Sequence, residues 1–158
     1  MIKEKYLEYL ENAFMSLRKA DHIVYVTFPW IRDKKLLLLG FEELYKTIYN
    51  LINAILQYEY LYKRISLYKN QRDNFETFRT ECSRRYGISV NEINIILNIF
   101  NIFKKHKESS MEFMRKEKIV IMMDNFKNET LDLEKLKIFL LLAKNLFKKV
   151  EEKVKQRI

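Results

Sequence analysis

Glycine, proline, cysteine and histidine are all scarce in this chain of 158 residues, and each scarcity excludes a class of structure or site. Two glycines and one proline are far below the usual shares of about 7% and 5%. Sheets joined by tight turns normally need glycine at positive φ, so the sequence predicts a few long helices and rare turns. With Gly40 and Gly87 alone, a glycine-rich phosphate-binding loop is also excluded.

The few cysteines and histidines limit the chemistry further. The single Cys82 excludes an internal disulfide and a cysteine-based zinc cluster. His22 follows Asp21, and a carboxylate beside an imidazole can orient a general base, although a hydrogen-bonded histidine at a helix end is the commoner arrangement. His106 stands among three lysines and is interpreted as a surface residue near a helix C-terminus. We therefore predict no enzyme, and no catalytic, cofactor-binding or metal-binding residue.

No targeting or membrane segment is evident. The first residues carry charges throughout and lack the apolar centre of a signal peptide. The longest uncharged run, Thr47–Tyr58, is shorter than the ~20 residues that span a bilayer. We expect a cytoplasmic protein that does not bind membranes, with residues 1–158 forming one domain.

Most of the chain has helical periodicity. Apolar residues recur at alternating spacings of three and four, the pattern of helices with one buried stripe. The first helix is expected over about residues 2–28 and ended by Pro29. The second is expected over about residues 34–68, with a break near 58–64 left open.

Capping signals predict the boundaries of the later helices. Asp73 with Glu76, and Ser89 with Glu92, have the spacing of a capping box and predict the starts of a third and a fourth helix. Gly87 is the expected C-cap of the third. A last helix is expected to start near Thr130 or Asp132. The predicted fold is all-α, a single-domain bundle of about five helices with one irregular, partly extended segment near 108–129.

The fourth helix has an unusually wide apolar face. Its apolar residues cover about two-thirds of a helical wheel, more than a surface helix needs. Such a helix is either central in the bundle or buried by a second copy of the chain. Ile95, Ile99 and Ile102 lie on one edge of this face and are the candidate dimer contacts.

The net charge of +9 is concentrated in two segments, 61–88 and 130–158. Tyrosines alternate with lysines and arginines over 58–72, as in proteins that stack single-stranded RNA on aromatic rings, although packing at the rim of the core is the more frequent role of such tyrosines. The candidate nucleic-acid contacts are the cations Lys63, Arg64, Arg72, Arg79, Arg84, Arg85, Lys148 and Lys149.

Several runs of the chain resemble small archaeal all-helical proteins. These runs are Ala20-Asp21-His22, Tyr25-Val26-Thr27-Phe28-Pro29, Asp33-Lys34-Lys35-Leu36-Leu37, Glu112-Phe113, Arg115-Lys116-Glu117-Lys118-Ile119-Val120-Ile121 and Leu133-Glu134-Lys135.

The helix order also resembles HEPN domains, helical bundles that commonly dimerise and include ribonucleases and RNA-binding modules. Ribonuclease members carry an arginine, four to six residues and then a histidine. Here three residues separate Arg18 from His22, and no arginine precedes His106 at that distance. The resemblance thus implies the bundle and dimerisation but not nuclease activity.

These observations favour a non-enzymatic helical interaction module that forms a homodimer or pairs with another protein. The alternative is a weakly selective RNA-binding module that uses the basic segments 61–88 and 130–158. Basic charge alone does not decide between them, because it also serves solubility and non-specific attraction.

Overall fold

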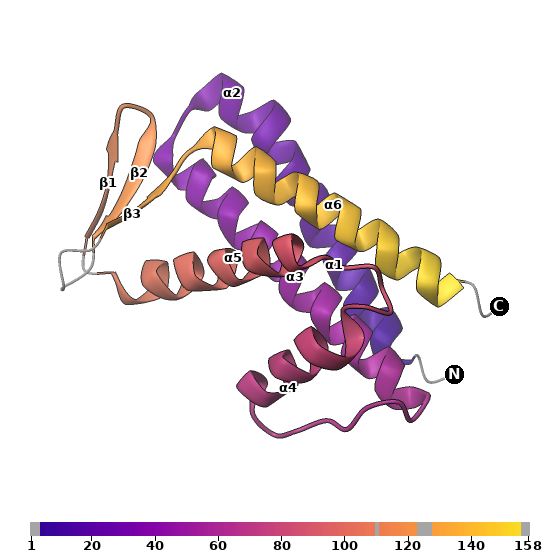
Figure 1. Ribbon diagram of the computed structural model, residues 1–158. Coiled ribbons are helices and arrows are strands. Elements are labelled where there is room, and N and C mark those ends of the chain that lie inside the picture. The colour runs from indigo at the N-terminus through magenta and orange to yellow at the C-terminus, as the bar shows by residue number, and fades with distance from the viewer. Residues whose placement is uncertain (1–3, 110, 123–127, 156–158) are drawn as a thin grey trace.

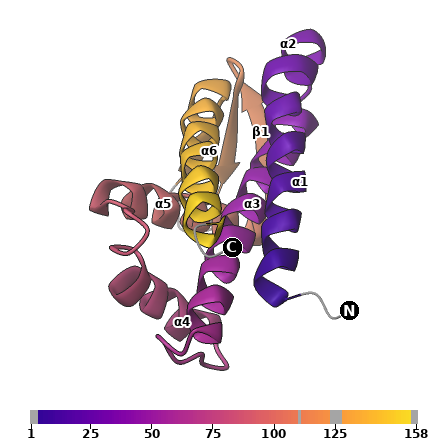
Figure 2. The ribbon, with the colours of Figure 1, turned by 90° about the vertical axis from the view of Figure 1, so that its right-hand side faces the viewer.

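Three long helices form the centre of the protein in this computed structural model, which describes residues 4–109, 111–122 and 128–155 (Figure 1). They are α1 (Lys5–His22), α3 (Lys34–Leu61) and α6 (Leu133–Lys155). Both α1 and α6 pack on α3, and the two views show them side by side along it (Figures 1 and 2). A further helix, α5 (Val90–Glu108), packs against α3 and α6. The predicted helical bundle is confirmed, but a small sheet is added to it.

The first helix does not end at Phe28 as predicted. After α1 the chain makes a π-helical turn, η1 (Ile23–Thr27), and continues as α2 (Phe28–Ile31) through Pro29. The wider π turn directly before Pro29 changes the hydrogen-bond register where the proline lacks an N–H, so the helix can continue past it. The helix ends at Arg32, whose φ of 51° is left-handed.

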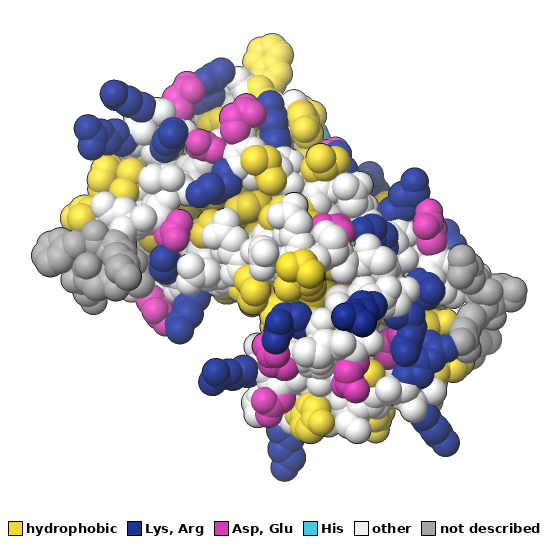
Figure 3. Space-filling view, viewed as in Figure 1, with side chains coloured by type: hydrophobic (Ala, Val, Ile, Leu, Met, Phe, Trp, Pro, Cys, Tyr) yellow, Lys and Arg dark blue, Asp and Glu magenta, His cyan; other side chains and the backbone are white. Residues whose placement is uncertain are grey.

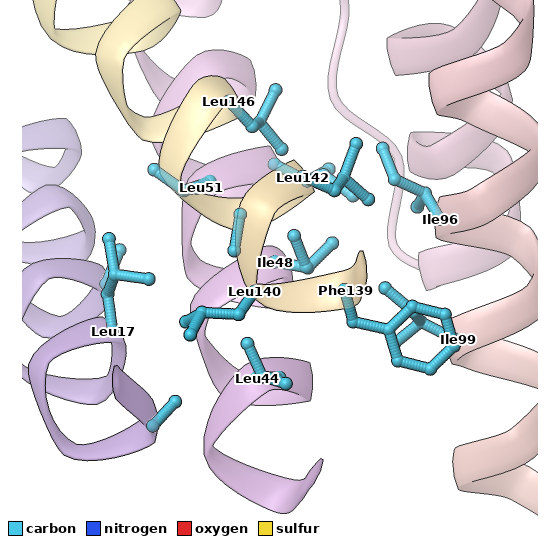
Figure 4. Packing of buried hydrophobic residues seen from close by; sticks show 14 of the residues in the cluster. Leu17, Leu44, Ile48, Leu51, Ile96, Ile99, Phe139, Leu140, Leu142 and Leu146 are labelled. Atoms are coloured by element: carbon cyan, nitrogen blue, oxygen red, sulfur yellow. The ribbon is translucent and has the colours of Figure 1, made fainter. Parts of the chain in front are cut away.

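The central helix α3 is apolar on most of its surface. Figure 4 shows its buried side chains between those of α1, α5 and α6, with Phe139 of α6 beside Ile99 of α5. The helix ends at Leu61 rather than near residue 68, close to the break that the sequence left open. Lys63 follows with φ of 60° and turns the chain away. The fully buried apolar side chains of α3 are Leu37, Phe41, Leu44, Ile48, Leu51 and Ile55.

The third predicted helix starts three residues earlier than expected. It comprises α4 (Gln71–Thr77) and a second π-helical turn, η2 (Phe78–Cys82). Asn70 is its N-cap, with a side chain that accepts from the Asp73 backbone N–H at 2.8 Å. The capping-box assignment of Asp73 is therefore wrong, since an asparagine serves this role equally well. The C-cap is Ser83 rather than the predicted Gly87, which has φ of 67° in the turn that follows the helix.

The caps of the last two helices are confirmed. Ser89 accepts from the Glu92 N–H at 3.1 Å, and the Glu92 carboxylate accepts from the Ser89 N–H at 3.0 Å, which completes a capping box for α5. At the start of α6 the Asp132 carboxylate accepts from the Lys135 N–H at 2.8 Å. Both caps satisfy N–H groups that a helix leaves without a partner.

The segment near 108–129 is more regular than predicted. It contains β1 (Met111–Arg115) and β2 (Lys118–Met122), which with β3 (Asn128–Leu131) form an antiparallel sheet in the order β1-β2-β3. Arg115 pairs with Lys118 across a two-residue turn in which both residues have positive φ. This is the hairpin geometry usually signalled by glycine or asparagine, which are absent here. The signal that would have predicted the hairpin is missing from the sequence.

The sheet covers one end of the bundle, and polar contacts tie it to the helices (Figure 1). His106 at the end of α5 lies between two carboxylates, with Nδ1 2.7 Å from Glu112 Oε2 of β1 and Nε2 3.0 Å from Glu42 Oε1 of α3. The interpretation of His106 as a surface residue is therefore wrong. Arg32 pairs with Glu117 in the hairpin turn, and Lys105 pairs with Glu129 of β3 at 2.9 Å.

None of the helices within the described residues combines the length and the apolar character needed to cross a bilayer.

The capping box of α5 gives a test of this fold. Ser89→Ala removes the acceptor for the Glu92 N–H, so the free energy of unfolding should fall by about 1 kcal/mol and the midpoint temperature by about 2–4 °C. Thermal unfolding followed by circular dichroism measures the change. Ser66→Ala, at an exposed serine outside the helices, should leave the midpoint in place. Equal midpoints for the two variants would contradict the assigned cap.

Candidate functional site

A cavity lined by aromatic and basic side chains lies between α3, α4 and α5. It has a volume of about 620 Å³, within the range of small-molecule sites. We call it the aromatic notch, because its walls include five aromatic rings. In the view of Figure 3 the surface is indented between the parts formed by α5 and α4, and hydrophobic side chains are exposed there. The residues that line it are Tyr45, Tyr49, Ile52, Asn53, Leu56, Gln71, Arg72, Asn74, Phe75, Phe100, Phe103, Lys104, Lys107 and Glu108.

Helical spacing brings the five rings together. Tyr45 and Tyr49 are four residues apart on α3, and Phe100 and Phe103 are three apart on α5, so each pair shares one face. Tyr45 stacks on Phe103 with ring centroids 3.6 Å apart and planes 3° from parallel. Phe75 of α4 meets Phe100 edge to face at 5.4 Å. All five aromatic residues are half-buried.

Cations stand beside the rings. Arg72 and Lys104 are exposed side chains that line the notch, and the Lys107 ammonium lies over the Phe103 ring, 5.3 Å from its centroid. Gln71 donates to the Tyr49 hydroxyl at 3.2 Å. Burial raises the pKa of Tyr45, so its hydroxyl stays protonated at neutral pH. The notch thus combines apolar rings with three positive charges, one carboxylate (Glu108) and few fixed polar contacts.

A buried ion-pair cluster holds the chain beyond α3 in place. Glu59 near the end of α3 is fully buried, and its two carboxylate oxygens accept from Arg64 at 2.6 Å and from Arg85 at 2.5 Å. These arginines lie on either side of α4 and η2 in the chain. One carboxylate therefore fixes both ends of the segment that carries Phe75 and Arg72.

The Cys82 thiol and the Tyr86 phenol next to this cluster stay protonated at neutral pH. Cys82 and Tyr86 are buried. Burial, and after it the Glu59 carboxylate, raises the pKa of the Cys82 thiol to about 12. The same two causes raise the pKa of Tyr86 far above its ordinary range. At neutral pH neither group supplies an anion, and only a thiolate is a good nucleophile.

The predicted nucleic-acid contacts fall into different environments. Arg64 and Arg85 are held by Glu59, Arg79 pairs with Glu76 at 2.7 Å, and Lys149 pairs with Glu92 at 2.7 Å. Arg72 lines the aromatic notch. Lys63, Arg84 and Lys148 are exposed outside it. The predicted set is therefore not one surface, and four of its members have carboxylate partners.

The two basic segments nevertheless meet at one point. The Lys149 ammonium donates to the Gly87 carbonyl at 2.7 Å, which brings the C-terminal half of α6 beside the connection between η2 and α5. Figure 3 shows Lys and Arg side chains gathered beside the C-terminal end of α6.

The structure does not offer the predicted dimer contacts as a surface. Ile99 and Ile102 are both 0% exposed within one chain, and Ile95 is half-buried against the core. The wide apolar face of α5 is explained by contacts with α3 and α6 on one side and by the notch on another. Dimerisation itself stays a prediction.

The Asp21–His22 neighbours do not act as a pair. The Asp21 carboxylate is 2.6 Å from the Lys144 ammonium of α6, while the His22 side chain is exposed. Among the described residues, no group of three or more His, Cys, Asp or Glu side chains is placed to hold a metal ion.

Sequence reasoning missed most of the notch. The Tyr-rich stretch pointed to residues 58–72, yet Tyr58 is buried against Tyr6, and Tyr60, Tyr62 and Tyr68 are exposed away from the notch. The rings of the notch come instead from the second, third and fourth of the predicted helices. A usable signal was the excess width of the apolar face on α5, which includes Phe100 and Phe103.

Comparison with protein-family models, with curated proteins and with solved structures found no match to this chain. The resemblance to HEPN bundles stays a prediction. The functional interpretation therefore rests on the chemistry of the notch.

The Glu59 cluster gives a stability prediction. Glu59→Gln removes the charge between Arg64 and Arg85, and we expect the free energy of unfolding to fall by about 3 kcal/mol, the low end for a broken buried pair because both guanidinium groups reach solvent. Urea unfolding followed by circular dichroism measures the loss. The matched control is Glu76→Gln, whose exposed pair with Arg79 should matter little. If both variants unfold at the same urea concentration, the cluster does not anchor this segment.

Proposed function

We propose that the chain is a non-enzymatic binding module and that the aromatic notch binds single-stranded nucleic acid. The observation that carries this proposal is the combination of five half-buried rings with three cations around one cavity. Proteins that bind single strands use aromatic rings to stack bases and cations to meet the backbone phosphates.

The geometry of the rings supports a stacked base. Phe103, Tyr45 and Tyr49 already form a run of stacked rings with Tyr45 in the middle, and the Tyr45 and Tyr49 centroids are 6.1 Å apart. All three residues are half-buried and line the cavity, so a nucleobase entering the notch can extend the stack at its ends. Every base has such a face, and stacking of this kind is tolerant of sequence.

The cations favour an anionic ligand over a neutral one. Arg72 comes from α4, and Lys104 and Lys107 come from α5, so positive charge stands on two sides of the notch. Phosphates bound there would release counterions, and three contacts give a slope of about −2 when log affinity is plotted against log salt. Little sequence selectivity is expected, because the lining amides of Asn53 and Asn74 are engaged with backbone groups.

Binding of a fluorescein-labelled single-stranded RNA of ten uridines, followed by anisotropy at two salt concentrations, tests this function. Lys104→Glu with Lys107→Glu should weaken binding at low salt by more than tenfold and reduce the salt slope. Tyr49→Leu removes one stacking face and should cost about 1–3 kcal/mol of binding.

Matched controls separate the notch from general charge. Lys35→Glu reverses one charge at an exposed lysine on α3, as each of the two notch substitutions does, and Tyr68→Leu makes the same ring deletion at an exposed tyrosine outside the notch. Both should bind as the parent protein does. Arg84→Glu and Lys148→Glu test the basic segments directly. Binding that depends on these two and not on Lys104 and Lys107 would place the nucleic acid elsewhere, and no binding at low salt would remove this function.

A mononucleotide offers the same base and phosphate as a strand. Uridine monophosphate added as a competitor distinguishes a site for a nucleic-acid strand from a site for a free nucleotide. We expect displacement only at concentrations far above those of the RNA, because a single nucleotide meets only one of the phosphate contacts. Equal affinity for the two would assign the notch to a free nucleotide.

Pairing with another protein is the second candidate function. The observation that favours it is a set of large exposed apolar side chains on α1, η1, α2 and α6, away from the notch. They are Phe14, Met15, Tyr25, Val26, Trp30, Ile31, Ile138 and Leu141.

A further inference from the structure

The outer surface along the line where α1 and η1 meet α6 has its own chemistry. We call it the α1–α6 seam and define it as residues 14–25 together with residues 137–148. Phe14 and Phe147 are 5.8 Å apart between ring centroids, and the Asp21 carboxylate is 2.6 Å from Lys144. These contacts show that the two helices run antiparallel side by side, as Figure 2 also shows.

Apolar side chains stand exposed on both sides of the seam. On the α1 side, Phe14 is 46% and Tyr25 53% exposed, and on the α6 side Ile138 is 57% and Leu141 61% exposed. The Tyr25 ring lies against α6, with the ammonium groups of Lys137 and Lys144 at 5.6 and 5.4 Å from its centroid. Side chains from two neighbouring helices thus form one exposed apolar surface, a type of surface that marks interaction sites.

The charge along the seam is almost wholly positive. The two stretches contain Arg18, Lys19, Lys137, Lys144 and Lys148 but a single carboxylate. That carboxylate, Asp21, is already held by Lys144. Arg18 lies over the Phe14 ring at 5.7 Å, and Lys148 is exposed one turn beyond Lys144. The Glu134 carboxylate, just outside the seam, is 3.7 Å from the Lys137 ammonium. The remaining excess of positive charge favours a partner that places negative charge beside the apolar side chains.

We infer that the α1–α6 seam docks an acidic amphipathic helix of a partner protein. Apolar residues on both sides of the seam are what a third helix needs in order to pack against two. The cations at its edges select a helix whose polar face carries Asp and Glu. A second copy of this chain would bring like charges together across a two-fold interface, which costs binding energy.

The probe is a fluorescein-labelled helical peptide of about four turns, with leucines at i, i+3, i+4 and i+7 and glutamates on the other face. Anisotropy should show saturable binding that weakens with salt. Ile138→Gln with Leu141→Gln should weaken it about tenfold or more, and Lys148→Glu should weaken it mainly at low salt. All three positions are exposed, and unchanged circular dichroism spectra verify that the variants fold.

Matched controls keep the inference testable. Leu97→Gln changes an exposed leucine on α5, outside the seam, and should leave peptide binding unchanged. A peptide with lysines in place of glutamates should bind at least tenfold more weakly. Equal binding of the two peptides, or binding that survives Ile138→Gln with Leu141→Gln, overturns the inference.

Two other occupants are outcomes of the same experiment. Sedimentation equilibrium at micromolar concentrations detects a dimer, and a dimer abolished by Ile138→Gln with Leu141→Gln would assign the seam to a second copy. Cosedimentation with vesicles of anionic phospholipid detects a lipid surface, and binding to vesicles in the absence of peptide binding would assign it there. Either result would overturn the proposal that the seam docks an acidic helix. Lys104→Glu with Lys107→Glu should not affect peptide binding. The proposal for RNA binding at the notch and the proposal for peptide binding at the seam can therefore fail independently.

Discussion

The apolar circumference of α3 is the constraint on which the rest of the structure depends. Its buried residues recur on several faces, so the helix must be covered on several sides rather than on one stripe. α1, α6 and α5 each cover one of these sides. A helix of 28 residues is about 42 Å long, and the sheet and α4 lie toward its two ends (Figure 1). The buried carboxylate of Glu59 is tolerated near one end because two arginines neutralise it there.

This arrangement leaves two incompletely covered surfaces that differ in character. Where α4 and α5 approach α3 without meeting along their length, rings from all three helices remain half-open and form the notch. Where α1 and α6 lie side by side, no further helix of the described residues lies above their outer faces (Figure 2). The proposed sites share no helix, so occupancy of one does not sterically prevent occupancy of the other. A module that joins a nucleic acid to a protein needs such a separation.

Periodicity and capping residues predict most of the helices, because a buried stripe and the Ser89–Glu92 capping box each involve residues only three or four positions apart in the sequence. The sheet could not be predicted, since its hairpin turn uses Lys116 and Glu117 at positive φ and lacks the residues that usually mark such turns. Of the eight predicted nucleic-acid contacts, only Arg72 lines the aromatic notch. Charge counting could not separate Arg72 from Arg64 and Arg85, because the position of the buried Glu59 carboxylate between these two guanidinium groups becomes visible only in three dimensions.

The position of α6 in the core has a consequence for how the protein is made. Its side chains Leu136, Leu140, Ala143 and Leu146 are buried against segments that are synthesised earlier. During translation at about 5–20 residues per second, the apolar faces of α1, α3 and α5 stay uncovered until residues 133–155 leave the ribosome. Closure of this part of the core during synthesis therefore waits for α6.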